Sequence, residues 1–433
     1  MVYLVAQLNL YIHQIDIKTT FLNGDLDQLI YMEQPKYFKD IKNPDYVCLL
    51  KKTLYGLKQS PRFWYYMLHQ FLIKKGYKRL KSDQNLYTRH IGTHILILVV
   101  YVDDILIISN SVEHIKMAKE ELAATFSIID GGPLHYMLGI EFNLHGPDNN
   151  IQLCQRKFAE DILNKYQMMD LKPSPIPADA HLSLSSDMAP KDPQEIKEME
   201  TQPFREMLGS LRYLVSCTRL DLCYIIGNYL SRFMQNPGKP HLDALLQVFQ
   251  YLKSTTLLGL SYKRQNHHDL QLQGWCDAYY NSDKDTRHST TGYVFTIASG
   301  AISWKSKKQN TVALSSTEAE FIAPAYTAKE GVWLQRLLFE FLAECTTRVC
   351  TSILPKFTLG IDNQSYITLS NIMKILNILT IGFSSSDPTS LVFCFRILPT
   401  RTKPTCPRTF CLYLYSLTAY VYAHYRGVSN TNV

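Results

Sequence analysis

The chain has 433 residues, of which 46% are hydrophobic and 19% charged, a composition typical of a globular protein of about two or three domains and not of a disordered chain. Its net charge of +7, from 45 basic and 38 acidic residues, is compatible with a nucleic-acid partner but does not require one. The ten cysteines form no CxxC pair, which favours a reduced intracellular protein. The N-terminus does not resemble a signal peptide, and no uncharged run is long enough to span a bilayer, so we expect no membrane partner.

Two short strands are predicted first. Apolar residues on either side of Asp16 predict a strand within Ile12–Phe21, Gly24 indicates a turn, and Ile30–Pro35 predicts a second strand that ends at proline. A single acid at a strand end is most often a cap or turn residue, so Asp16 by itself indicates no function.

A basic and aromatic stretch follows. Lys51–His90 holds ten Lys and Arg residues against one acid. Within it, Ser60 as N-cap, Pro61 at the first helical position and Gly76 after the last one predict a helix over Pro61–Lys75. The side chains expected to face inward are Phe63, Met67, Phe71 and Trp64. The stretch is either a solvated basic helix end over an aromatic core or a surface that binds a nucleic-acid strand.

The apolar run Ile95–Ser109, ILILVVYVDDILIIS, is interrupted by Asp103 and Asp104. Its β-branched residues predict two buried strands joined by a tight turn at Val102–Asp104. Two adjacent carboxylates at such a tip are costly to bury without partners, and divalent cations are the usual partners. An ordinary acidic surface turn is the alternative, and this stretch alone does not decide between them.

The next predicted elements are helices over Ser111–Phe126 and Lys157–Tyr166, with a hairpin between them that pairs Leu134–Phe142 with Ile151–Gln155. Six prolines in Lys172–Pro203 predict a linker and a domain boundary.

The second half predicts a mixed helix and strand pattern. Phe204–Leu252 reads as three helices, and strands are then predicted over Leu258–Lys263, Leu270–Ala278, Thr291–Ser299, Ala301–Lys308 and Phe357–Ser365. A long helix is expected over Thr317–Leu342. The order indicates an α+β or α/β layer with Asp277 and Asp362 at strand ends.

Two glutamates near the start of this helix have a sufficient structural explanation. Thr317 with Glu320, and Ser315 with Glu318, each match a capping box. Pro324 removes the backbone hydrogen bond to the Glu320 carbonyl, at a cost of about 3 kcal/mol, and predicts a kink.

Five stretches, taken together and in order, resemble the reverse transcriptase and ribonuclease H regions of copia-type retrotransposon Pol polyproteins. They are QIDIKTTFLNGDL, KTLYGLKQSPRFWY, LVVYVDDILI, LGIEF and SWKSKKQNTVALSSTEAEFIA. The likeness extends over about Val5–Asn371. It implies a mixed α+β and α/β chain: a polymerase palm with thumb-like helices, followed by a ribonuclease H-like domain.

In the palm, the resemblance implies that Asp16 and Asp103 are metal ligands and that Asp104 is the less directly bound partner in the turn. It places Phe21 beneath the incoming sugar and Gln59 against template or nucleotide, and the hairpin around Leu138–Phe142 would grip the primer end. Lys58 and Arg62 of the basic stretch are further candidates for template binding.

In the second domain, Asp277, Glu320 and Asp362 match three of the four ribonuclease H carboxylates, with Glu318 as the alternative to Glu320. Each site would hold two Mg²⁺ ions, with Mn²⁺ as an alternative, because two-metal phosphoryl transfer needs carboxylates around ions about 3.5–4 Å apart.

The predicted domains are a palm with truncated fingers (1–171), a linker (172–203), thumb or connection helices (204–264), a ribonuclease H-like domain (265–371) and a divergent tail (372–433). The tail holds one acid, Asp387, which leaves the fourth ribonuclease H ligand unassigned.

The expected partners are an RNA template, a DNA primer, an RNA–DNA hybrid and other parts of a Pol polyprotein. The expected location is the cytoplasm, within a virus-like particle if the element is active, with access to the nucleus. The competing hypothesis is a catalytically dead retroelement remnant that only binds nucleic acid.

Overall fold

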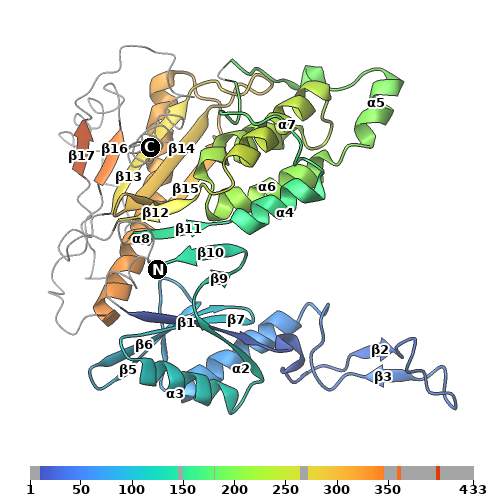
Figure 1. The fold of residues 1–433 in the computed structure, drawn as a ribbon, viewed down its shortest axis with the longest axis vertical. Coiled ribbons are helices and arrows are strands. Elements are labelled where there is room, and N and C mark those ends of the chain that lie inside the picture. The colour runs from blue at the N-terminus through green and yellow to red at the C-terminus, as the bar shows by residue number, and fades with distance from the viewer. Residues whose placement is uncertain are drawn as a thin grey trace, which may run out of the picture. The chain divides into compact units, whose positions relative to one another are not determined.

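The computed structural model describes residues 10–144, 150–179, 181–263, 272–345, 358–361 and 396–399. It divides into two compact units, which Figure 1 shows. The first unit consists of Met1–Met137 and Leu337–Thr351, and the second of Leu138–Arg336 and Ser352–Val433. None of the described helices has the length and apolar character that a membrane crossing requires.

The first unit is built on an antiparallel six-stranded sheet with the order β4-β5-β6-β7-β1-β8. Its strands are β1 (Tyr11–Ile17), β4 (Lys78–Arg79), β5 (Leu86–Ile91), β6 (His94–Tyr101), β7 (Asp104–Ser109) and β8 (Ile128–Pro133). The remaining elements are the 3₁₀ turn η1 (Thr20–Leu22), the hairpin β2 (Tyr31–Glu33) and β3 (Val47–Leu49), the helices α2 (Ser60–Lys74) and α3 (Val112–Ala123), and β9 (Tyr136–Met137). The β2–β3 hairpin projects from the rest of this unit (Figure 1).

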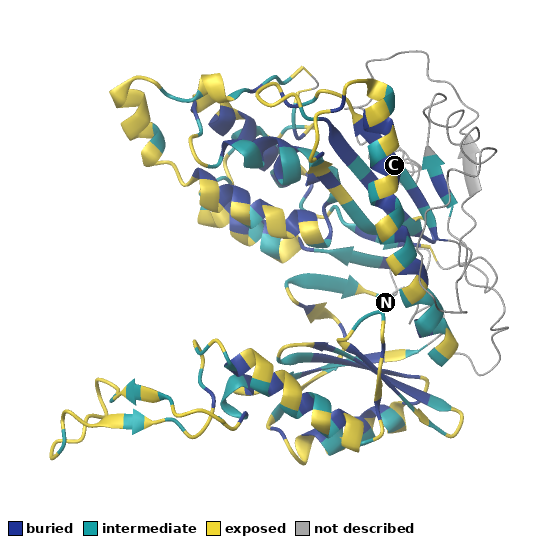
Figure 2. Ribbon diagram, turned by 180° about the vertical axis from the view of Figure 1, so that it is seen from behind, coloured by how far each residue is buried: buried dark blue, intermediate teal, exposed yellow. Residues whose placement is uncertain are grey.

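Helices α2 and α3 cover one face of this sheet, and buried residues concentrate between them and the strands (Figure 2). The core joins Trp64, Leu68 and Leu72 of α2 to Ile15 and Ile17 of β1, with Ile105 and Ile107 of β7 beside them. Because side chains alternate along a strand, the neighbours of these residues, among them Asp16 beside Ile15 and Asp104 beside Ile105, lie on the sheet face away from the two helices.

The predicted helix over Pro61–Lys75 is confirmed to within one residue at each end, and Gly76 has the positive φ of +84° expected after a helix. Two details were wrong. Gln59 is the N-cap, while the Ser60 hydroxyl donates to the Leu54 carbonyl oxygen at 2.6 Å. The inward-facing row was predicted only in part: Trp64 is buried, and Met67 and Phe71 pack against the core although they are half-buried. The fully buried row also contains Leu68 and Leu72, which were not predicted, and Phe63 is half-buried.

The second unit contains the neighbouring strands β12, β11 and β10 of a four-stranded sheet, and the five-stranded sheet β15-β14-β13-β16-β17. Its strands are β10 (Ile140–Asn143), β11 (Ile151–Cys154), β12 (Leu260–Tyr262), β13 (Gln273–Tyr279), β14 (Thr290–Ile297), β15 (Gly300–Lys308), β16 (Thr358–Ile361) and β17 (Arg396–Pro399). Strands β13, β14 and β15 are antiparallel neighbours, and β16 runs parallel to β13.

The helices of the second unit are α4 (Arg156–Lys165), α5 (Pro193–Glu200), α6 (Phe204–Cys217) and α7 (Lys239–Ser254). Short turns are η3 (Ser186–Met188), η4 (Leu220–Leu222), η5 (Ile225–Tyr229) and η6 (Leu230–Phe233). Helix α8 (Ser316–Cys345) begins in this unit, and its last residues belong to the first. The predicted three helices over Phe204–Leu252 were therefore wrong in the middle, where a π turn lies between 3₁₀ turns.

Helix α8 stays continuous through Pro324. The strands predicted around Asp277 and before Asp362 are present as β13 and β16. Asp362 itself lies outside the described residues. Within the proline-rich segment 172–203, Leu184 is buried and its backbone N–H donates to the Tyr229 hydroxyl at 2.9 Å.

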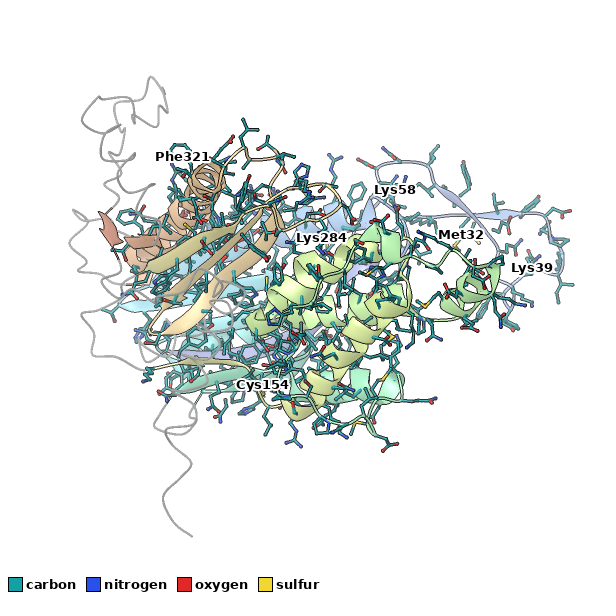
Figure 3. The ribbon with its side chains drawn as sticks, turned by 90° about the horizontal axis from the view of Figure 1, so that it is seen from above. Met32, Lys39, Lys58, Cys154, Lys284 and Phe321 are labelled. Carbon is teal, nitrogen blue, oxygen red and sulfur yellow. The ribbon has the colours of Figure 1, made fainter. Side chains whose placement is uncertain are left out.

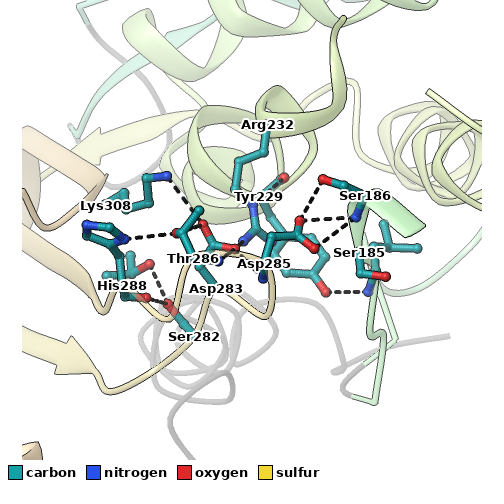
Figure 4. Close-up of polar contacts among 12 residues, drawn as sticks. Ser185, Ser186, Tyr229, Arg232, Ser282, Asp283, Asp285, Thr286, His288 and Lys308 are labelled. Atoms are coloured by element: carbon teal, nitrogen blue, oxygen red, sulfur yellow. Dashed lines mark hydrogen bonds and ion pairs between the residues drawn. The ribbon is translucent and has the colours of Figure 1, made fainter. Parts of the chain in front are cut away.

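A buried carboxylate anchors the loop between β13 and β14 (Figure 4). Asp283 lies 2.7 Å from Nη1 of Arg232 and 3.3 Å from Nζ of Lys308, and it accepts hydrogen bonds from the Thr286 hydroxyl and the Asp285 backbone. Burial raises the pKa of Asp283, but the hydrogen bonds from Thr286, the Asp285 backbone and Lys308, together with the charge of Arg232, outweigh burial and lower this pKa to about 2.

We expect Asp283→Asn to lower the free energy of unfolding at pH 7 by about 3 kcal/mol, because it leaves the Arg232 charge without its carboxylate in a mostly buried place. The pKa of Asp283 in the folded protein is below the ordinary value of 3.8. The contribution of the ionised Asp283 carboxylate to the free energy of unfolding is therefore complete above pH 3.8 and is lost as pH falls through about 2. Urea unfolding at pH 7 and at pH 2 should therefore show the difference shrinking in acid. Asp161→Asn, at an exposed position on α4 in the same unit, is the control and should leave stability unchanged. Equal stability of Asp283→Asn and the wild-type chain at pH 7 would contradict this assignment.

Candidate functional site

The two acids of the central stretch lie at a tight turn between β6 and β7. Tyr101 pairs with Asp104 across the hairpin, so Val102 and Asp103 form a two-residue connection. Val102 has a φ of +56°. The first residue of a two-residue hairpin turn needs a positive φ so that the twist of the turn matches the twist of its strands. The predicted pair of strands with a turn at Val102–Asp104 is confirmed.

Strand β1 brings Asp16 to this turn. Asp16 pairs directly with Asp104 in the β1–β7 register, and the Ile17 N–H donates to the Asp103 carbonyl oxygen at 2.9 Å. Directly opposite residues of an antiparallel pair project to the same sheet face. The fold thus places Asp16, Asp103 and Asp104 together, although Asp16 is far from the others in sequence.

These carboxylates act on one another electrostatically. Burial raises the pKa of Asp104, and the negative charges of Asp103 and Asp16 raise it further. A cation would reverse this effect because it favours the ionised carboxylates, and carboxylate oxygens are the ligands that Mg²⁺ prefers. Among the residues that the structure describes, no group of three His, Cys, Asp or Glu is arranged to hold a metal ion. The site therefore offers suitable donor atoms but not a formed coordination shell.

Phe21 lies in η1, five residues after Asp16, and its ring meets the Tyr55 ring edge-on at 5.2 Å. Gly24 allows this segment to approach α2, because a Cβ there would lie 2.9 Å from both the Phe63 Cβ and the Thr53 hydroxyl oxygen. Phe21 is only partly buried, so the residue packs against Tyr55 and still stays accessible.

The basic stretch is largely solvent-exposed around the start of α2. Lys58 and Arg62 are exposed, and Gln59 between them is half-buried; Figure 3 shows Lys58 before α2, and Met32 and Lys39 on the β2–β3 hairpin. Not every cation in the stretch is available to a partner, because Arg89 is bound to Glu121 at 2.8 Å. An exposed aromatic lies close by in sequence, since Tyr55 is 55% exposed.

Leu138, at the predicted primer hairpin, has a φ of +52°, and its carbonyl oxygen accepts a hydrogen bond from the Tyr213 hydroxyl. Strand β10 follows it and pairs with β11. This hairpin is therefore tied to α6 within the second unit.

Two of the three acids predicted in the second unit are described, and both are buried: Asp277 on β13 and Glu320 on α8. Ala278 and Ala319, their chain neighbours, belong to one buried alanine cluster, which lets the strand and the helix approach closely. Glu318 instead caps the helix, since its carboxylate accepts the Leu314 N–H at 2.7 Å and its own N–H donates to the Ser315 hydroxyl. Asp362 and Asp387 lie outside the described residues.

Sequence reasoning missed the role of Trp64, which was assigned only to the core. Its indole N–H donates to the Val102 carbonyl oxygen at 2.8 Å. No local signal predicts this contact, because Trp64 and the turn meet only when α2 packs on the sheet.

Comparison with known proteins adds independent evidence. Residues 1–180 match the family model described as reverse transcriptase (RNA-dependent DNA polymerase). The chain is 40% identical over 338 residues to the retrovirus-related Pol polyprotein from transposon TNT 1-94 of Nicotiana tabacum. The aligned region covers 78% of this chain and 25% of that polyprotein. It is also 40% identical over 331 residues to the retrovirus-related Pol polyprotein from transposon RE1 of Arabidopsis thaliana, and the aligned region covers 76% of this chain and 22% of that polyprotein.

A shorter relative is matched over nearly its whole length. The putative transposon Ty5-1 protein of Saccharomyces cerevisiae is 32% identical over 317 residues, 73% of this chain and 99% of the relative. By contrast, the chain spans about a quarter of the length of the two plant Pol polyproteins.

Proposed function

Because the chain belongs to the reverse transcriptase family of copia-type retrotransposon Pol polyproteins, we propose that its first unit is a polymerase palm that extends a DNA primer on an RNA template. The observation that carries the proposal is the pairing of Asp16 with Asp104 beside the Asp103 turn. An ordinary acidic surface turn does not need a third carboxylate from a distant strand beside it, because the negative charges repel one another.

In this proposal Asp16 and Asp103 hold Mg²⁺, and Asp104 adds negative charge beside them. The bound ions would neutralise charge on the transferred phosphate and favour the ionised primer hydroxyl. Phe21, which is partly accessible, supports the sugar of the incoming nucleotide, while Lys58 and Arg62 bind template phosphates. Gln59, half-buried between them, contacts template or nucleotide.

Primer extension tests this proposal. The full chain is incubated with an RNA template, a 5′-labelled DNA primer, deoxynucleotides and Mg²⁺ or Mn²⁺, and products are resolved on a denaturing gel. Template-dependent extension supports the proposal. Binding of the hybrid without any extension would favour the competing function, a remnant that only binds nucleic acid.

Binding itself should depend strongly on salt. Each phosphate neutralised by Lys or Arg adds about 0.9 to the slope of log affinity against log salt concentration for a duplex. We expect the double variant Lys58→Ala/Arg62→Ala to bind an RNA–DNA hybrid more weakly and with a slope reduced by about two. Fluorescence anisotropy across a salt series measures both quantities.

Lys116→Ala is the matched control, because this lysine side chain is 79% exposed on α3 outside the basic stretch. It should leave the slope unchanged. An unchanged slope in the double variant as well would remove Lys58 and Arg62 from the binding surface.

For the second unit we propose a ribonuclease H-like role. Three features support it: the antiparallel strands β13–β15 with β16 parallel beside β13, the burial of Asp277 and Glu320, and the packing of β13 on α8 through the alanine cluster. Asp277, Glu320 and Asp362 would hold the metal ions. Cleavage of the RNA strand of a labelled hybrid by the wild-type chain, lost in Asp277→Asn, would support this role, and cleavage that survives the substitution would reject it.

A further inference from the structure

Backbone strain in the first unit is confined to the neighbourhood of the three acids. Among the described residues of this unit, the non-glycine residues with positive φ are Thr19, at +50°, and Val102, at +56°. Both are β-branched, the class of residue for which this conformation is most unfavourable. Thr19 follows Asp16 by three positions, and Val102 directly precedes Asp103. Strain of this kind persists only where surrounding contacts enforce it, and it gathers at functional sites.

A buried side chain contacts the backbone of Val102. Trp64 is 3% exposed, its ring packs edge-to-face on Phe126 at 5.4 Å, and its indole N–H reaches the Val102 carbonyl oxygen at 2.8 Å. The next carbonyl, that of Asp103, is fixed by the Ile17 N–H. Both carbonyl oxygens of the two-residue turn are thus held, one by helix α2 and one by strand β1.

We propose that Trp64 is a positioning residue: its indole N–H holds the Val102 carbonyl so that Val102 stays in the left-handed conformation from which Asp103 is presented beside Asp16. The inference rests on the proposed polymerase function, since it assigns to Asp103 a geometry needed for metal binding and nucleotide transfer. Trp64 acts through the turn and touches neither metal nor substrate. A tryptophan needed only for packing would use its ring, and its N–H would be dispensable.

The test separates the N–H from the ring. Trp64→Phe keeps an aromatic ring against Phe126 and removes the donor. We expect it to lower the single-turnover extension rate by about a hundredfold, the scale of an ångström-level misplacement of a reacting group, while the affinity for primer–template stays unchanged. Mn²⁺ affinity, titrated by electron paramagnetic resonance without nucleotide, should fall as well.

Val102→Gly supplies the rescue, because glycine adopts positive φ without strain and no longer needs the clamp. In the Trp64→Phe background it should restore most of the lost rate and of the Mn²⁺ affinity. Trp304→Phe is the matched control: the Trp304 indole N–H also donates to a backbone carbonyl, that of Val215, at 2.8 Å, but in the second unit. It should change neither primer extension nor the Mn²⁺ affinity of the first unit.

The outcomes distinguish this inference from the proposed function. If the wild-type chain extends no primer, the polymerase proposal is rejected. The Mn²⁺ affinities of the wild-type chain and Trp64→Phe then decide by themselves whether Trp64 positions Asp103. Wild-type rates and Mn²⁺ affinity in Trp64→Phe, or a loss that Val102→Gly does not rescue, overturn the positioning role. If Trp64→Phe does not fold, hydrogen exchange of the wild-type Trp64 indole N–H decides: strong protection that weakens in Val102→Gly supports the clamp, and exchange at the rate of an exposed tryptophan overturns it.

Discussion

Asp103→Asn and Asp16→Asn are each expected to slow primer extension by about a thousandfold, the upper range for removal of one group that stabilises developing charge in an enzyme. An amide keeps the size and one oxygen of the carboxylate but removes the negative charge that would attract Mg²⁺ in the proposed site. Asp16 belongs to strand β1, and Asp103 belongs to the turn between β6 and β7. Equal losses of extension rate in the two variants would therefore show that both acids serve one active site. Single-turnover extension on an RNA template measures the effect.

Template affinity should stay within about twofold in both variants, because the carboxylates contribute no phosphate contact and their removal lowers repulsion of the nucleic acid. Asp45→Asn, an exposed acid in the loop between β2 and β3, is the control and should extend normally. Wild-type extension by either active-site variant would show that its carboxylate does not hold the metal.

The second large effect concerns folding. Arg219 is 1% exposed in the second unit, and its guanidinium binds Asp221 at 2.8 Å, the Thr255 carbonyl oxygen at 3.0 Å and the Thr255 hydroxyl at 2.8 Å. Arg219→Ala should lower the free energy of unfolding by about 3–5 kcal/mol, because it leaves the buried Asp221 charge unpaired and a cavity beside it. Urea unfolding followed by circular dichroism measures the loss.

An exposed ion pair of the same unit is the matched control. Lys239 and Asp243 form an i,i+4 pair with side chains 69% and 54% exposed, and Lys239→Ala should cost no more than about 1 kcal/mol. The double variant Arg219→Met/Asp221→Leu should recover much of the loss, because an apolar pair removes the unpaired charge. A loss below about 1 kcal/mol in Arg219→Ala would show that Asp221 finds another partner.

Local sequence determined much of the first unit. Two apolar runs rich in β-branched residues on either side of Asp103 and Asp104 predicted β6, the turn and β7, and Pro61 and Gly76 indicated the limits of α2. These signals depend on backbone geometry within a few residues. The same reasoning failed at Phe204–Leu252. Three helices were expected there, but the bonds of Arg219 to Asp221 and Thr255 fix the chain where α6 ends, and short 3₁₀ and π turns follow.

The sequence by itself determined the family, the two acids of the turn and the approximate positions of many strands and helices, but it did not predict strands β3, β4, β5 and β8 or helix α5. Only the tertiary structure decided which row of α2 is buried, since adjacent rows of the helix are both apolar and the sheet selects Trp64, Leu68 and Leu72. It also decided that Asp16 meets Asp104, because the pairing of β1 with β7 depends on the whole sheet order. The Trp64 contact with Val102 belongs to the same class: a hydrogen bond between distant segments forms only after packing of the apolar core has brought them together.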